Sequence, residues 1–328
     1  MTKYSVGKLI FKSPFASSLV GFIKEKQGMG RKYICEASNL HTFDQFVIEQ
    51  GFSSQIITKK IFNEWTAKRI YERDKTCENR RNVFKQFCQY IIRNGGVAYL
   101  PGTMKRCKKD KAYRPYIFTN SELEQFLNSV HIIKGSKKRK TVFMMLFSLL
   151  ICTGMRVGEA LKLERKDIIN KGKNAVIIIR NAKFDKDRMI PLAENLTLQL
   201  MEYLQCLELL FPNSSCVFPA CHGKAYSTHE VYIVFRKVLR QAGISHGGPG
   251  KGPRVHDFRH TYAVKTLRKL VLEGANIMAV IPFLCQYLGH KNTASTQIYL
   301  QFTADMFPHV MSAIESSFGE VIPELELK

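Results

Sequence analysis

The sequence predicts a mainly α-helical protein with a small antiparallel β-sheet, divided into two domains. Its 328 residues exceed what one hydrophobic core usually organises, which favours two domains. Apolar residues recur with the period of amphipathic helices through most of the chain. Only residues 174–180 and 188–192 have β-type composition, and the short stretch between them fits a hairpin.

The first part of the chain is expected to be a basic arm followed by a helical domain. Residues 1–13 scatter lysines among small and apolar residues, which indicates a flexible basic arm. Residues 14–100 carry several helical patterns, with Thr58 as a candidate N-cap and Gly95-Gly96 as a helix stop. The apolar positions are expected to form a core, and the opposite faces are basic. The core candidates are Leu40, Phe43, Phe46, Val47, Ile61, Phe62, Trp65, Val83, Phe84, Phe87, Tyr90 and Ile91.

A basic linker over residues 101–118 is expected to join the two domains. Residues 101–115 have proline at both ends, no periodicity and many lysines and arginines, which predicts extended chain. The second domain, residues 119–328, opens with a capping box of Thr119 and Glu122. An apolar helix ends at Cys152, and a new helix begins after Thr153-Gly154. Further helices are expected near 194–210, 227–242, 257–273, 277–288, 293–302 and 305–317.

The charge of the chain indicates a polyanionic partner. Fifty lysines and arginines against 27 aspartates and glutamates give +23, and residues 1–118 alone carry 23 against 9, a net +14. Nucleic acid is the first candidate for such a partner, ahead of an anionic membrane. No apolar run is long enough to span a bilayer or to act as a secretory leader, and the nine cysteines lie mostly in apolar runs. We therefore expect a cytoplasmic protein with reduced thiols and no membrane partner.

Three short motifs carry candidate chemistry. They are T-G-M-R-V-G-E-A-L (153–161), H-D-F-R-H-T-Y-A (256–263) and L-G-H (288–290), and Tyr299 follows nine residues after His290. Arginines offer planar charged forks that match phosphate oxygens, so Arg156 and Arg259 are candidate phosphate clamps. His256 and Arg259 share one face of a helix that begins near them. These residue types suit attack of a phenol on a phosphodiester, since fixed cations would neutralise the pentacoordinate phosphorus.

These motifs resemble those of the tyrosine recombinase (phage integrase) family, and the resemblance covers residues 119 to about 305. It implies a helical core-binding domain over residues 14–100 and a mixed α+β catalytic domain. The catalytic residues it implies are Arg156, Lys183, His256, Arg259, His290 and Tyr299. Within this set, Tyr299 is the nucleophile, and Lys183, in the hairpin, protonates the leaving 5′ oxygen. Glu159 is expected to orient an arginine, and His260 to pack behind the site.

The implied activity is site-specific cleavage and rejoining of duplex DNA through a 3′-phosphotyrosyl intermediate, without metal or ATP. The implied partners are double-stranded DNA recombination sites, a homo-tetramer assembled on DNA through a C-terminal helix at about 305–317, and accessory DNA-bending proteins. That helix could also dock within its own chain. The alternatives are relaxation of DNA in the manner of a type IB topoisomerase, and a non-catalytic DNA-binding accessory protein.

No metal or cofactor is expected. The eight aspartates form no acidic motif of the kind that holds two magnesium ions, which disfavours a two-magnesium mechanism. Cys216, Cys221 and His222 have part of a zinc-ligand spacing but lack a fourth ligand at the usual distance. We interpret that segment as a loop before the helix near 227.

Overall fold

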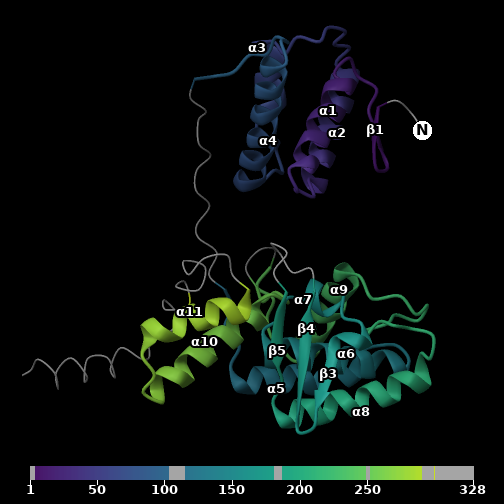
Figure 1. The fold of residues 1–328 in the computed structure, drawn as a ribbon, viewed down its shortest axis with the longest axis vertical. Helices are drawn as coiled ribbons and strands as arrows, with labels where there is room; N and C mark the ends of the chain where they lie inside the picture. Colours follow the sequence, from purple (N-terminus) through teal and green to yellow (C-terminus); the bar gives the residue numbers. More distant parts are fainter. Residues whose placement is uncertain (1–3, 103–114, 181–186, 249–251, 290–298, 300–328) are drawn as a thin grey trace, which may run out of the picture. The chain divides into compact units, whose positions relative to one another are not determined.

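The computed structural model describes residues 4–102, 115–180, 187–248, 252–289 and 299. The chain divides into two compact units, Met1–Tyr113 and Arg114–Lys328 (Figure 1). Residues 103–114, and with them most of the expected linker, lie outside the described residues, as do the helices expected near 293–302 and 305–317. Within the described residues, no helix is long and apolar enough to cross a membrane.

The first unit is a helical bundle with a short β-hairpin. Its elements are β1 (Ser5–Val6), β2 (Leu9–Ile10), α1 (Ala16–Gly28), α2 (Ile34–Glu49), α3 (Lys59–Thr66) and α4 (Asp74–Arg93). The predicted core residues of these helices pack into one core, where the ring centres of Phe43 and Phe84 lie 4.6 Å apart. The hydroxyl of Thr58 accepts a hydrogen bond from the Ile61 N–H, so the predicted N-cap of α3 is present.

The N-terminal segment differs from the expected flexible arm. β1 and β2 pair in antiparallel register, Phe11 is buried, and Val6 and Leu9 pack against the helical core. The backbone N–H groups of Lys12 and Ser13 each donate to the carboxylate of Asp44, both at 2.9 Å. That partner lies 31 and 32 residues along the chain, so no local pattern could indicate it.

The second unit contains the three-stranded antiparallel sheet. Its helices are α5 (Asn120–Asn128), α6 (Lys137–Thr153), α7 (Val157–Ala160), α8 (Glu194–Leu210), α9 (Thr228–Gln241), α10 (Asp257–Leu272) and α11 (Ile277–Leu288), with 3₁₀ turns at Ser129–Ile132 and Arg165–Asp167. The strands are β3 (Ile168–Lys171), β4 (Asn174–Ile179) and β5 (Arg188–Pro191), in the order β3-β4-β5. The predicted capping box joins Thr119 and Glu122 at the start of α5.

The sheet agrees with the prediction in strand β4 and differs from it in strand β3. β4 buries alternate residues, Ala175, Ile177 and Ile179, as its composition predicts. β3 was not predicted, because its sequence I-I-N-K is short, exposed beyond its first residue and without alternation. Residues 181–186, between β4 and β5, lie outside the described residues.

A buried helix and an aromatic cluster position the functional motifs. α6 packs against both α8 and α10, and α10 packs beside α11 (Figure 1). At the start of α10, the buried ring of Phe258 lies 5.0 to 6.3 Å from four other rings, those of Phe118, Phe126, Phe147 and Phe235. Because Phe258 stands between His256 and Arg259, core packing fixes the backbone from which both of these side chains project.

We predict that Phe258→Ala destabilises the second unit by about 3–5 kcal/mol, because it removes a buried ring from a close-packed cluster. Phe258→Leu keeps most of the buried volume and should cost about 1.5 kcal/mol or less. Denaturant unfolding followed by circular dichroism measures both. Equal losses for the two variants would show that the ring cluster does not hold the start of α10.

Candidate active site

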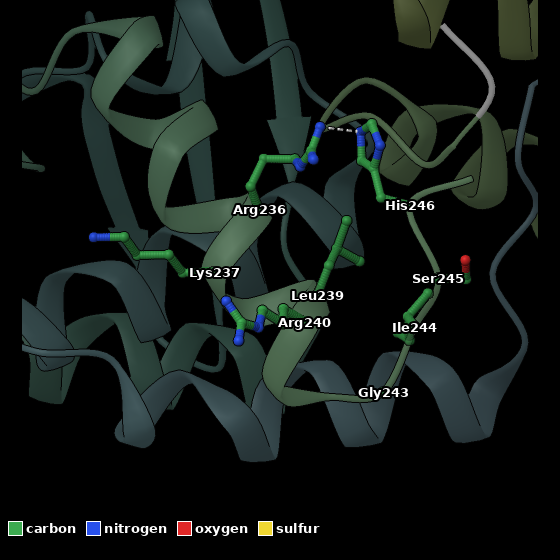
Figure 2. Close-up of a pocket in the computed structure, with 8 residues that line it drawn as sticks. All are labelled: Arg236, Lys237, Leu239, Arg240, Gly243, Ile244, Ser245 and His246. Atoms are coloured by element: carbon green, nitrogen blue, oxygen red, sulfur yellow. Dashed lines mark hydrogen bonds between the residues drawn. The ribbon is translucent and has the colours of Figure 1, made fainter. Parts of the chain in front are cut away.

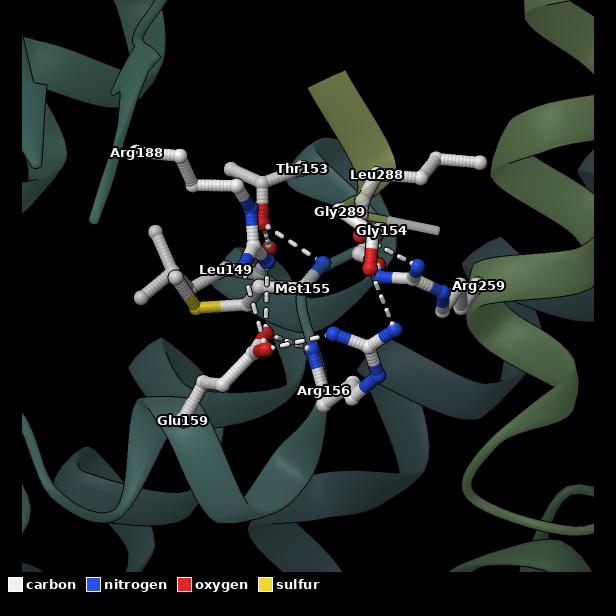
Figure 3. A network of polar contacts seen from close by, with 10 residues as sticks. All are labelled: Leu149, Thr153, Gly154, Met155, Arg156, Glu159, Arg188, Arg259, Leu288 and Gly289. Atoms are coloured by element: carbon white, nitrogen blue, oxygen red, sulfur yellow. Dashed lines mark hydrogen bonds and ion pairs between the residues drawn. The ribbon is translucent and has the colours of Figure 1, made fainter. Parts of the chain in front are cut away.

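Three segments bring the candidate residues together. Arg156 follows the end of α6, Arg259 lies in the first turn of α10, and Leu288-Gly289 ends α11. Figure 3 shows these segments around one cluster of polar contacts. Gly154, which ends α6, has φ +62°, and a Cβ there would lie 2.6 Å from the Tyr262 ring. Glycine at this position therefore lets α6 end closely against α10, within reach of Arg259.

Arg259 is almost fully buried, with 1% of its surface exposed. Its Nη1 donates to the Gly154 carbonyl at 3.1 Å, and its Nη2 donates to the Leu288 carbonyl. Among the described residues, its Nε has no hydrogen-bond partner. Burial, and then the charge of Arg156, lower the pKa of Arg259 to about 10, so it stays protonated at neutral pH. A buried donor without an acceptor is costly, and a substrate oxygen would satisfy it.

Arg156 is held by a carboxylate and by the end of α11. Its Nη1 donates to Glu159 Oε1 at 2.7 Å, its backbone N–H donates to Glu159 Oε2 at 2.9 Å, and its Nη2 donates to the Gly289 carbonyl at 3.0 Å. The α11 carbonyls carry the partial negative charge of a helix C-terminus, which favours guanidinium groups there.

A third arginine completes this network. Arg188, on β5, donates from Nη1 and Nη2 to the two oxygens of Glu159 at 3.0 and 2.6 Å. The side chains of Arg188 and Glu159 are only 9% and 11% exposed. Burial alone would raise the pKa of Glu159, but hydrogen bonds and charge from Arg188, with hydrogen bonds from Arg156, lower it to about 2. Glu159 therefore lies ionised between two arginines (Figure 3).

Two histidines stand beside the arginines at the start of α10. The rings of His256 and His260 lie 4.9 Å apart and nearly perpendicular. The pKa of both is lowered to about 4, first by burial and then by neighbouring groups: His260, Arg259 and Arg156 for His256, and Arg259 and Arg254 for His260. Part of the His256 surface is nevertheless exposed to solvent. Both imidazoles are neutral at pH 7 and can accept a proton.

Tyr299 lies against the same cluster. It is 1% exposed and packs with Ala263, Val264 and other apolar residues of α10 and α11. Its ring lies 5.6 Å from that of His260. The pKa of the phenol is raised above its ordinary value, because burial outweighs the charge of Arg259, a hydrogen bond with Arg259 and the charge of Arg156, which lower it. The phenol therefore lies within the electrostatic influence of both guanidinium groups.

The structure thus brings together four of the six predicted site residues: Arg156, His256, Arg259 and Tyr299. Lys183 and His290 lie outside the described residues. Among the described residues, no group of three or more histidine, cysteine or acidic side chains could hold a metal ion.

Sequence reasoning missed Arg188 as part of the site. A signal was present, because alternation along β5 puts Arg188 on the same face as the buried Ile190. A cation on the inward face of a strand requires a buried partner. Gly289 was also missed; its φ is +66°, and a Cβ there would lie 3.1 Å from Arg188 Nη1.

The chain is similar in sequence to known proteins. A family model described as the phage integrase family matches residues 117–305. A putative integrase/recombinase of Sinorhizobium fredii is 25% identical over 92% of this chain and 98% of its own length. Tyrosine recombinase XerC of Lactobacillus delbrueckii subsp. bulgaricus is 26% identical over 68% of this chain and 71% of its own.

Solved structures share the fold at lower identity. The XerH site-specific recombinase bound to a difH substrate has a TM-score of 0.63 at 23% identity, over 90% of this chain and 84% of its own. A lambda integrase tetramer bound to a Holliday junction has a TM-score of 0.61 at 15% identity, over 86% of this chain and 76% of its own. These matches extend over most of both units of the chain.

We predict that Arg188→Gln destabilises the second unit by about 3–5 kcal/mol, because it leaves a buried carboxylate without its bidentate partner. The double variant Glu159→Gln/Arg188→Gln should lose much less than the sum of the two single variants, since no unpaired charge remains between them. Denaturant unfolding measures all three. Lys166→Gln is the control: it removes the surface pair of Lys166 with Glu164, whose side chains are 68% and 42% exposed, and should change the unfolding midpoint far less. Additive losses would rule out the coupling.

We also predict that His256 and His260 titrate near pH 4 in the free protein and that bound DNA raises both midpoints, because a nearby phosphate favours the imidazolium. Between pH 6.5 and about 4, the unfolded chain binds protons that the folded chain does not, so stability should fall as the pH falls through this window. NMR of ¹⁵N-labelled histidine rings measures the midpoints. Values near 6.5 in the free protein would contradict the assigned environment.

Proposed function

The chain belongs to the phage integrase family and is a tyrosine-type site-specific recombinase that cleaves and rejoins DNA, and we propose that Tyr299 is its nucleophile. The observation that carries this proposal is the cluster of Arg156, Arg259 and Tyr299, which come from distant parts of the chain. We propose Arg156 and Arg259 as clamps on the non-bridging oxygens of the scissile phosphate.

In the proposed reaction, the Tyr299 oxygen attacks the phosphorus and the bond to the 5′ oxygen breaks. The products are a 3′-phosphotyrosyl bond and a free 5′ hydroxyl. Rejoining reverses these steps when a 5′ hydroxyl, from the same strand or another, attacks the phosphotyrosyl bond. Because the energy of the phosphodiester is kept in that bond, neither ATP nor a metal is required.

The charges of the site support these roles. Besides burial, the charges of Arg156 and Arg188 lower the pKa of Arg259. Such crowding of like charges favours an anion between them. The phosphate gains further charge in the transition state, which fixed donors stabilise without having to reorganise. The Nε of Arg259, which has no hydrogen-bond partner among the described residues, would offer one such donor.

Proton transfer requires a base near the phenol and an acid near the leaving oxygen. We propose His256 as the base, because its imidazole is neutral at pH 7 and lies beside the arginines. Lys183 lies outside the described residues. We propose that it is the acid that protonates the leaving 5′ oxygen. His290 is proposed to donate to the phosphate, since it directly follows Gly289, whose carbonyl accepts from Arg156.

We propose that the helical unit, residues 14–100, is a core-binding domain, and that residues 101–118 follow the DNA backbone between it and the catalytic domain, residues 119–328. The excess of +14 over residues 1–118 supports contact with phosphates. A homo-tetramer on two double-stranded sites is proposed by analogy with the lambda integrase tetramer, with the segment at about 305–317 as the protein contact. Accessory DNA-bending proteins are proposed to assist assembly of the tetramer. The proposed location of the protein is the cytoplasm.

Two other functions remain as outcomes to be tested. A topoisomerase-like enzyme would relax supercoiled plasmid without exchanging strands between two sites. A DNA-binding accessory protein would form no covalent adduct. Sequencing the DNA ends attached to trapped protein would identify the sites, after which strand exchange between two such sites separates recombination from relaxation.

We predict that Tyr299→Phe abolishes the covalent protein–DNA adduct on a nicked suicide substrate and leaves DNA affinity within about twofold, because only the attacking oxygen is lost. Denaturing gel electrophoresis measures the adduct and a mobility shift measures binding. Tyr287→Phe is the matched control, since Tyr287 is also largely buried in the second unit, stacked on Tyr262. An adduct at full yield with Phe at 299 would reject Tyr299 as nucleophile.

The adduct assay should also be run with the unsubstituted protein in excess EDTA. Unchanged adduct formation by the unsubstituted protein is the expected result, because the proposed charge stabilisation comes from arginines. Loss of cleavage in EDTA would point instead to a metal-dependent reaction.

A further inference from the structure

The turn between α3 and α4 presents two apolar side chains to solvent. Residues 69–72 form a tight turn in which the Glu72 N–H donates to the Arg69 carbonyl at 3.1 Å. Ile70 and Tyr71 occupy its two central positions and are 91% and 98% exposed. No other large apolar side chain among the described residues is as exposed as these two.

This composition is unusual for a turn. Glycine, proline, asparagine, aspartate and serine dominate such positions, because they fit the backbone or bond to it locally. Isoleucine and tyrosine offer neither advantage, and both leave apolar surface in water. Where a sequence opposes its local structure, a functional reason is the usual one.

Buried interactions hold this turn firmly in place. Arg80, 3% exposed, donates from Nε and Nη2 to the two carboxylate oxygens of Glu72 at 2.8 and 2.6 Å, and from Nη2 to the Ala67 carbonyl at 2.9 Å. Its Nη1 also donates to the Trp65 carbonyl. The Arg69 N–H donates to Glu72 at 3.3 Å. These contacts lower the pKa of Glu72 to about 2, with the hydrogen bond from Arg80 as the largest cause. The exposed pair therefore stands on a rigid base.

The charge around the tip is positive. Arg69 and Arg73 are exposed on either side of it, and the Arg69 guanidinium lies 5.0 Å from the centre of the Trp65 ring. Glu72, the acidic residue of the turn, is 7% exposed and directed to Arg80. Asp74 is paired with Lys68 at 2.5 Å. The surface that a partner meets therefore consists of two apolar side chains between arginines.

We propose that this tip, Arg69 to Arg73, inserts Ile70 and Tyr71 into the minor groove of duplex DNA. The identity of the partner as DNA rests on the proposed function, and the groove and residues are the new inference. The walls of the minor groove are sugars, which suit apolar side chains, and its negative potential attracts flanking arginines. A protein partner would also cover the apolar pair, but the cations on both sides favour a polyanion.

A photo-cross-linking experiment identifies the partner directly. A benzoylphenylalanine replaces Tyr71 in the full chain, which is irradiated with a mixed-sequence linear duplex at low salt. We expect a protein–DNA cross-link. The same photoreactive residue at Leu209, which is 86% exposed on α8 beside Glu208, is the control and should cross-link far less. Cross-links only between two protein chains would overturn the proposal and assign the tip to an interface between copies.

The groove is tested by competition on an A·T-rich duplex. Netropsin fills the minor groove of A·T tracts and should suppress the cross-link from position 71. A cross-link that persists at saturating netropsin, with the duplex still bound, would reject the minor groove.

Affinity measurements test the contribution of the apolar pair. The variant Ile70→Asn/Tyr71→Gly keeps residues that a turn accepts and should fold with an unchanged unfolding midpoint. We expect it to lose about tenfold or more in affinity for the duplex, with the same slope of log affinity against log salt, because no charge is removed. Arg73→Gln should reduce that slope by about one. Leu209→Ser is the matched control and should bind normally.

These outcomes separate the inference from the proposed function. If the unsubstituted chain fails to bind any duplex, the proposed function fails. If it binds and the double variant binds equally well without a cross-link from position 71, only the inference fails.

Discussion

One carboxylate makes the cationic cluster of this protein possible. The charge of Arg156 lowers the pKa of the buried Arg259, and Arg188 adds a third guanidinium. Glu159 accepts from both Arg156 and Arg188, and the carbonyls of Leu288 and Gly289 accept from Arg259 and Arg156. Without these acceptors, burying three guanidinium groups together would cost several kcal/mol for each charge. The position of α11 is therefore part of the electrostatics of the site.

The site keeps a net positive charge, because three arginines share one carboxylate. Among the described residues, the Nε groups of Arg188 and Arg259 have no hydrogen-bond partner and can each donate to a further acceptor. A phosphate would meet donors already in place, and their charges are fixed across the neutral pH range. The positive charges of the arginines also help to lower the pKa of His256 and His260. Burial, together with the charges of Arg259 and Arg156, keeps His256 unprotonated at neutral pH.

Most of the fold could be predicted, because helical periodicity, caps and glycine stops are local signals. The capping box at Thr119 and the helix at 194–210 match the structure for that reason. The folded N-terminal hairpin could not be predicted, since Asp44 orders it from a distant position. In the site, Arg156, His256 and Arg259 were indicated by the resemblance of their motifs to those of a known family. Arg188 was not predicted, because its partner Glu159 lies 29 residues away.

The way the site is anchored suits a fold that is shared with a solved structure at only 23% identity. Three of the acceptors that position the arginines are main-chain carbonyls, those of Gly154, Leu288 and Gly289. A carbonyl is supplied by any residue, so substitutions nearby are tolerated as long as the backbone path is unchanged. That path depends on two positive-φ glycines and on close packing beneath α10. The constraint on sequence is therefore confined to the donors, to Glu159, to these glycines and to the volume of the core, and the remaining surface is free to adapt to a particular DNA site.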